Sequence, residues 1–250
     1  MKLNRLFLYS SVLIIAFSAC KKEETPATNS TPKDGNLSIV FDNMVGADPL
    51  VMSQLSFLNA AGNTYSVSLL KYYISNIELH KKDGSVFKPG NYELINAADP
   101  ASCTFSVGNL SSGDYDTMVF YIGIDSAKNH SGVQDGDLDV SKGMFWTWNT
   151  GYSFFKHEGQ YKNTAGQTKA LIFHLATDEA FTRITVPVNL SINGDKTMHL
   201  KFDLNSCYTS PVNIDFNVDN SHQSDQAGDA GWIANMKANF ADAFTFSKVD

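Results

Sequence analysis

Residues 143–159, GMFWTWNTGYSFFKHEG, carry the densest run of aromatic side chains in the sequence. Trp146 and Trp148 are two positions apart, and residues with that spacing share one face of a β-strand. Three glycines divide the segment, and glycine permits tight turns and close approach of neighbouring backbones. We therefore expect two short strands, bent at residues 149–151, that form an aromatic hairpin.

Alternating apolar and polar side chains predict β-strands along most of the remaining chain. The longest regular segment, residues 66–80, is rich in aromatic and β-branched side chains and is followed by a hairpin signal, Lys82-Asp83-Gly84. Pro187 places one strand at a sheet edge or gives it a bulge. Further strands are predicted at residues 36–43, 92–95, 104–107, 115–124, 170–175, 182–190 and 198–204.

One helix is predicted near the end of the chain, over residues 231–244. Ile233, Met236, Phe240 and Phe244 recur every three or four residues and give this helix one apolar stripe. Many short strands with a single helix are typical of a sandwich. We expect a mainly β fold: an immunoglobulin-like, two-sheet antiparallel β-sandwich with long loops and one C-terminal helix.

The N-terminus has the features of a bacterial lipoprotein. In residues 1–19, Lys2 and Arg5 precede an apolar stretch too short to cross a bilayer, which is typical of a signal peptide. Cys20 follows directly, so we expect cleavage before it and lipidation of its sulfur, which would anchor the protein at a membrane. Residues 20–35 then contain the lipidated cysteine and a flexible tether, and residues 36–250 form one domain.

The charge and the cysteine content limit the functions that the protein could have. The formal net charge is −7 and the basic residues do not cluster, which argues against nucleic-acid binding because phosphates require basic partners. Cys103 and Cys207 remain after lipidation of Cys20. A distant pair in an oxidising envelope is more often a disulfide than a metal site, so we expect a disulfide, with thiolate metal ligands as the alternative.

Motifs of the common enzyme classes are absent from the sequence. It contains no G-x-S-x-G, no G-x-x-x-x-G-K-[ST] and no H-E-x-x-H. Asp135, Asp137 and Asp139 alternate as at the start of an EF-hand loop, but Val140 and Trp146 stand where that loop needs glycine and glutamate. We expect a binding protein rather than an enzyme, and a solvated acidic loop rather than a calcium site.

Several segments resemble the MbnP-like copper-binding domain, a family related to periplasmic copper proteins of methanotrophs. The resemblance includes LKYYISNIELHKKDG at residues 70–84 and GIDSAKNHSGVQDGDLDVSKGMFWTW at residues 123–148. It continues in IFHLA at residues 172–176 and in IANMKANF at residues 233–240. The resemblance implies a β-sandwich that binds copper, as Cu(I).

The resemblance also implies a set of site residues. In the methanotroph relatives, a haem-containing partner oxidises one tryptophan to kynurenine, which holds copper together with two histidines. Here IFHLA keeps the histidine of the family's FH.G pattern and departs from it in the final alanine, which makes His174 the first candidate ligand. His222 and then His130 follow, and Trp146 or Trp148 would be the oxidised residue.

Two functions follow for comparison with the structure. The first is an envelope lipoprotein that binds copper for acquisition, storage or delivery, partnered by a haem-containing tryptophan-oxidising protein or a copper-uptake protein. The alternative is a surface carbohydrate-binding or adhesion module, in which Trp146, Trp148, Tyr152 and Tyr161 present an aromatic platform. Rings that converge on His174 favour the metal, whereas coplanar rings facing solvent favour a glycan.

Overall fold

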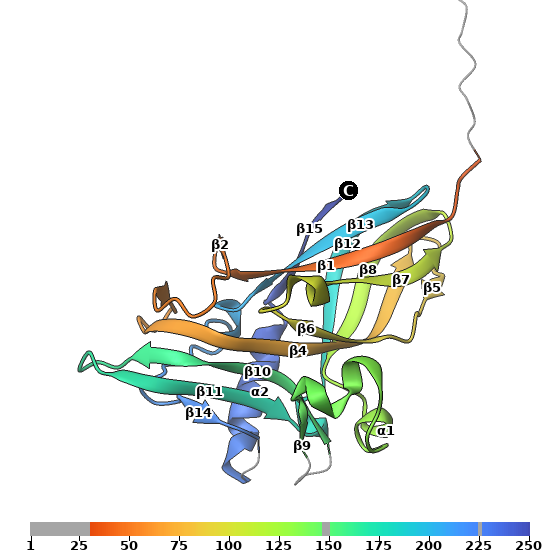
Figure 1. Ribbon diagram of the computed structural model, residues 1–250. Coiled ribbons are helices and arrows are strands. Elements are labelled where there is room, and N and C mark those ends of the chain that lie inside the picture. Colours follow the sequence, from red (N-terminus) through yellow and green to blue (C-terminus); the bar gives the residue numbers. More distant parts are fainter. Residues whose placement is uncertain (1–30, 147–150, 225–226) are drawn as a thin grey trace, which may run out of the picture. The chain divides into compact units, whose positions relative to one another are not determined.

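The structure is a computed structural model that describes residues 31–146, 151–224 and 227–250 (Figure 1). Residues 1–30, with the predicted signal peptide and Cys20, lie outside this part. The described residues are mostly β-strand and form two main sheets, which confirms the predicted β-sandwich. Within these ranges, no helix is long and apolar enough to cross a membrane.

The smaller sheet is built around β1 (Gly35–Val45), whose buried and partly exposed residues alternate along most of its length, as in a strand with one face on a core. β1 pairs in parallel with β13 (Lys196–Asp203) and antiparallel with β2 (Asp48–Pro49) and β7 (Thr104–Leu110). β15 (Phe244–Val249) pairs with the other side of β13. The sheet is therefore mixed, and not wholly antiparallel as predicted.

The larger sheet has the strand order β12-β8-β4-β10-β11-β14. Only the β11–β14 pair in this order is parallel. The register between β12 and β8 shifts after Pro187, as predicted for a proline inside a strand. The strands are β4 (Thr64–Lys81), β8 (Gly113–Ile122), β10 (Gly151–Lys162), β11 (Thr168–Ala176), β12 (Thr182–Ile192) and β14 (Ser221–His222), with β3 (Phe57–Leu58), β5 (Val86–Phe87) and β6 (Tyr92–Asn96) also paired to β4.

Aromatic rings from both sheets meet in one core. Phe41 of β1 lies 6.4 Å from Tyr72 of β4 and 5.8 Å from Phe120 of β8, measured between ring centroids. Phe202 of β13 lies 4.8 Å from Tyr72 and 6.4 Å from Phe155 of β10. Rings of this size each bury roughly 150–250 Å² and therefore dominate the packing between the sheets.

The C-terminal helix α2 (Ala230–Phe240) is shorter than predicted. Its apolar stripe is confirmed, because Ile233, Met236 and Phe240 are buried. Phe244 is the exception: it begins β15, and its ring reaches the core 4.7 Å from that of Phe202. The remaining short helices are α1 (Ser126–Asn129), η1 (Pro100–Cys103), η2 (Gly136–Leu138), η3 (Val140–Lys142), η4 (Asp178–Ala180), η5 (Ser206–Tyr208) and η6 (Ala227–Asp229).

The predicted disulfide is not present, because Cys103 and Cys207 are both free thiols. Each thiol has hydrogen-bonding partners close to it in the structure. The Cys103 sulfur lies 3.5 Å from Nδ2 of Asn43, whereas Cys207 is fully buried with its sulfur 4.0 Å from the backbone oxygen of Asp203. Burial raises the pKa of both thiols, which disfavours the thiolate form that a metal would need.

Gly159 marks a close approach of β10 to β4. The register between these strands shifts between Glu158 and Gly159, and a Cβ at Gly159 would lie 1.9 Å from the backbone oxygen of Ser66. No side chain fits there without movement of one strand.

Gly159→Ala should lower the free energy of unfolding by roughly 1–3 kcal/mol, because the added methyl group forces the two backbones apart. Urea denaturation at neutral pH measures this. Gly231→Ala is the matched control, since no atom outside the local helix backbone lies within 4 Å of its added Cβ and alanine favours a helix by roughly 0.5–1 kcal/mol. Equal stability of the Gly159 variant and the unmodified protein would contradict the close approach.

His157 is a titratable side chain that lies in the core. Its ring is fully buried, and Nδ1 lies 2.6 Å from the Tyr208 hydroxyl. Burial disfavours the charged imidazolium and lowers the pKa of His157 from 6.5 to about 4.

In the unfolded chain, His157 binds a proton more readily than in the folded protein. The free energy of unfolding should therefore fall as the pH drops from 6.5 towards 4. Linkage gives about 3 kcal/mol for this single group. His157→Phe should flatten the curve of unfolding free energy against pH by about that amount, since the variant keeps the other titrating groups. Parallel curves for the two proteins would show that His157 is not buried as a neutral ring.

Candidate metal site

The aromatic hairpin predicted from residues 143–159 is confirmed. β9 (Phe145–Trp146) pairs antiparallel with the start of β10, with Trp146 opposite Gly151 and Tyr152 opposite Phe145. β10 is a long strand rather than a short one. Trp148 and most of the bend lie at residues 147–150, outside the described ranges.

Two lysines fix the backbone that leads into this hairpin. Nζ of Lys71 in β4 donates to the backbone oxygen of Lys142, and Nζ of Lys156 in β10 donates to that of Gly143, both at 2.8 Å. Gly143 has a φ of 74°, which a glycine adopts without strain. Because charged donors make strong hydrogen bonds, the chain just before β9 is held against the outer face of the larger sheet.

The same outer face carries His174. Lys71, Lys156 and His174 lie directly opposite one another across β4, β10 and β11, so their side chains share a face. The ring of Trp146 lies over this face, with its centroid 6.3 Å from that of His174. Nε2 of His174 lies 2.8 Å from Oε1 of Glu158. Trp146, His174 and Glu158 thus meet although they come from three strands.

His222 lies on the opposite face of β11. Successive strand residues point to opposite sides, and His222 is in register with Phe173, the residue before His174. Its ring stacks 4.7 Å from that of Trp232 in α2. The two residues predicted first as ligands, His174 and His222, are therefore not brought together.

The nitrogens of His222 face carboxylates instead. Nδ1 lies 2.8 Å from Oδ1 of Asp229, and Nε2 lies 3.3 Å from Oδ1 of Asp219. Asp229 occupies the N-cap position of α2, so His222 ties the helix start to the segment before β14. This arrangement gives His222 a structural role on the core side of the sheet.

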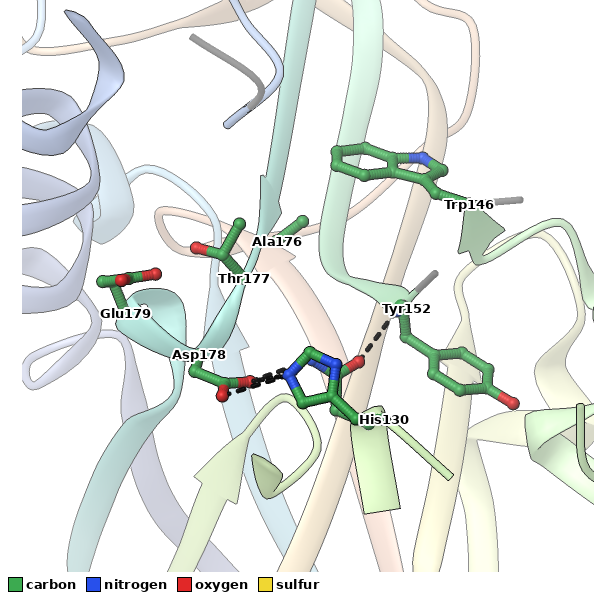
Figure 2. Close-up of a pocket in the computed structure, with 9 residues that line it drawn as sticks. His130, Trp146, Tyr152, Ala176, Thr177, Asp178 and Glu179 are labelled. Atoms are coloured by element: carbon green, nitrogen blue, oxygen red, sulfur yellow. Dashed lines mark hydrogen bonds and ion pairs between the residues drawn. The ribbon is translucent and has the colours of Figure 1, made fainter. Parts of the chain in front are cut away.

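His130, the third candidate, lines a cavity with Trp146. Its Nε2 lies 3.2 Å from both carboxylate oxygens of Asp178 in η4 (Figure 2). The cavity has a volume of about 240 Å³. Trp146 therefore borders two sites, one that contains His174 and one that contains His130.

Strained backbone surrounds the end of β11. Thr177 has φ 72° and ψ 158°, a region that side-chain-bearing residues rarely occupy and that costs roughly 1–3 kcal/mol. Ser224 also has a positive φ of 57°, and its hydroxyl donates to the backbone oxygen of His174 at 2.9 Å. Such strain persists only where the surrounding contacts enforce it. Here it occurs three residues after His174 and at a residue that bonds to the backbone of His174.

Sequence reasoning missed Glu158 and Asp178 as partners of the two histidines. Glu158 meets His174 only through the β10–β11 register, in which it is diagonal to the histidine.

The aspartates of the acidic loop make hydrogen bonds within the fold. Asp137 accepts from the backbone nitrogen of Leu94 at 2.8 Å, and Asp139 accepts from that of Ser141 at 2.7 Å. In the part of the chain that the structure describes, no group of three or more His, Cys, Asp or Glu residues could hold a metal ion.

The predicted glycan platform is not exposed. Trp146, Tyr152 and Tyr161 are only 8%, 1% and 4% exposed, and Trp148 lies outside the described residues. Tyr152 further directs its hydroxyl to the backbone oxygen of Leu138 at 2.8 Å. The described rings are therefore buried, and one of them, Trp146, lies beside His174.

Comparisons with known proteins agree with this fold. A structure of MbnP from Methylosinus trichosporium superposes with a TM-score of 0.52 and 17% sequence identity, over 71% of this chain and 78% of that chain. At that identity, the similarity supports the fold alone. No curated protein matches the sequence. The MbnP family model matches residues 34–226, well over half of the sequence, and the chain therefore belongs to the MbnP family.

Proposed function

We propose that the protein binds copper on the outer face of the larger sheet, with His174 as the central ligand. The observation that carries this proposal is the meeting of Trp146, His174 and Glu158, which come from three different strands. Imidazole is a good ligand for copper in proteins. Membership of the MbnP family supports the same assignment.

The donor atoms define the chemistry of this site. An imidazole nitrogen and a carboxylate oxygen suit Cu(II), whereas Cu(I) prefers softer sulfur ligands. The indole of Trp146 has a donor N–H and no lone pair for a metal. Oxidation of Trp146 or Trp148 to kynurenine would supply an aniline nitrogen, and in the case of Trp146 this group would lie beside His174.

The biological setting is also part of the proposal. Lipidation of Cys20 would hold the domain at a membrane of the cell envelope, where it would acquire, store or deliver copper without catalysis. A haem-containing protein that oxidises tryptophan, or a copper-uptake protein, would be its partner. The buried aromatic rings favour this role over glycan binding.

The chain without residues 1–20 should retain about one copper equivalent after loading and desalting. His174→Ala should weaken copper binding by about tenfold or more, because it removes the central ligand, and Glu158→Gln should weaken it by roughly 10–100-fold. Metal analysis by mass spectrometry, under oxidising and reducing conditions, measures the retained copper.

His80→Ala and His222→Ala are the controls. His80 pairs with Glu78 on another part of β4, and His222 lies on the core side of β11, so both variants should retain copper. If His222→Ala lost copper and His174→Ala retained it, the copper site would lie on the core side of the larger sheet. Absence of retained copper in both redox conditions would contradict copper binding by the domain.

A further inference from the structure

The cavity beside Trp146 is lined by residues of α1, β9, β10 and η4 (Figure 2). Trp146 of β9 lies on one side, and Asp178 and Glu179 of η4 lie on the other, with His130 held by Asp178. Its volume of about 240 Å³ is below the range of drug-sized pockets, so it accepts a group of few heavy atoms. It lies at the end of β11, beyond the His174–Glu158 pair.

Negative charge dominates the lining of this cavity. Burial would raise the pKa of Asp178, but hydrogen bonds from three neighbouring side chains outweigh it and hold the pKa below its ordinary value. A hydrogen bond from the Thr177 side chain likewise lowers the pKa of Glu179. No lysine or arginine is among the described lining residues, and Lys237 donates to the backbone oxygen of Glu179. Two carboxylates therefore face the cavity in ionised form.

A buried amide holds the walls in place. Asn129 donates from Nδ2 to Asp178 at 3.0 Å and accepts from the backbone nitrogen of Tyr152 at 2.8 Å. A Cβ at Gly151 would lie 3.1 Å from Oδ1 of Asn129, so glycine leaves room for this amide. α1, β10 and η4 are thereby linked around the cavity without a ligand.

We propose that this cavity binds the cationic head of a small aliphatic amine. An ammonium group is attracted both by carboxylates and by an indole ring, and Asp178, Glu179 and Trp146 all line the cavity. The volume of the cavity matches a free amine of few heavy atoms. The two sites share Trp146 but differ in their polar groups, because this cavity uses neither His174 nor Glu158.

The test is a titration of the chain without residues 1–20, whose folded residues form a compact unit of their own from Pro32 to Asp250. The probe is n-butylammonium chloride, followed by the ¹H–¹⁵N signals of the tryptophan indoles. A saturable shift of the Trp146 signal is expected, with n-butanol and potassium chloride causing no saturable shift at equal concentration. Equal saturable shifts with butanol or potassium would overturn an organic-cation site.

Variants separate this site from the copper site. Glu179→Gln and Asp178→Asn should each weaken butylammonium binding by about tenfold or more, because each removes one carboxylate charge. Asp116→Asn removes an exposed carboxylate on β8 and should leave the affinity unchanged. His174→Ala should also leave it unchanged, whether or not that variant loses copper. Unchanged binding by Glu179→Gln, which disturbs the local hydrogen bonds least, would overturn the proposal.

Discussion

The hydrogen bonds from Lys71 and Lys156 to two successive backbone oxygens are the contacts on which the outer face depends. They join strands β4 and β10 to the chain at residues 142–143, immediately before β9. Burial lowers the pKa of Lys156, nearby Glu158 opposes this shift, and nearby Lys71 adds to it. Together with the pairing of β9 and β10, this attachment holds the indole of Trp146 over His174.

The register of the larger sheet then decides which histidines can act together. One row across the sheet contains Lys71, Lys156 and His174, and the next contains Leu70, His157, Phe173 and His222. The first row faces outward, whereas Leu70, His157 and Phe173 are fully buried. A shift of one residue in β14 would exchange the face of His222, so the register alone places His174 and His222 on opposite faces of the sheet.

The sequence predicts the sandwich because alternation of apolar residues follows directly from strand geometry. It also predicts the β9–β10 hairpin, from aromatic residues between glycines. The predicted end of the helix at Phe244 is wrong, because a spacing of four residues fits both a continued helix and a strand that returns to the core. The Glu158–His174 contact depends on the exact register of the β10–β11 hairpin, and the face of His222 depends on the pairing of β11 with β14. The contact of His130 with Asp178 joins the end of α1 to η4, which are far apart in sequence.

The most direct test of this account is anomalous scattering at the copper K-edge from crystals of the copper-loaded protein. The account predicts one strong peak about 2 Å from a ring nitrogen of His174, on the face covered by Trp146. A peak beside His222, between Asp219 and Asp229, would contradict the assignment of the site to the outer face. A copper peak that contacts neither histidine would show that the meeting of Trp146, His174 and Glu158 serves packing alone.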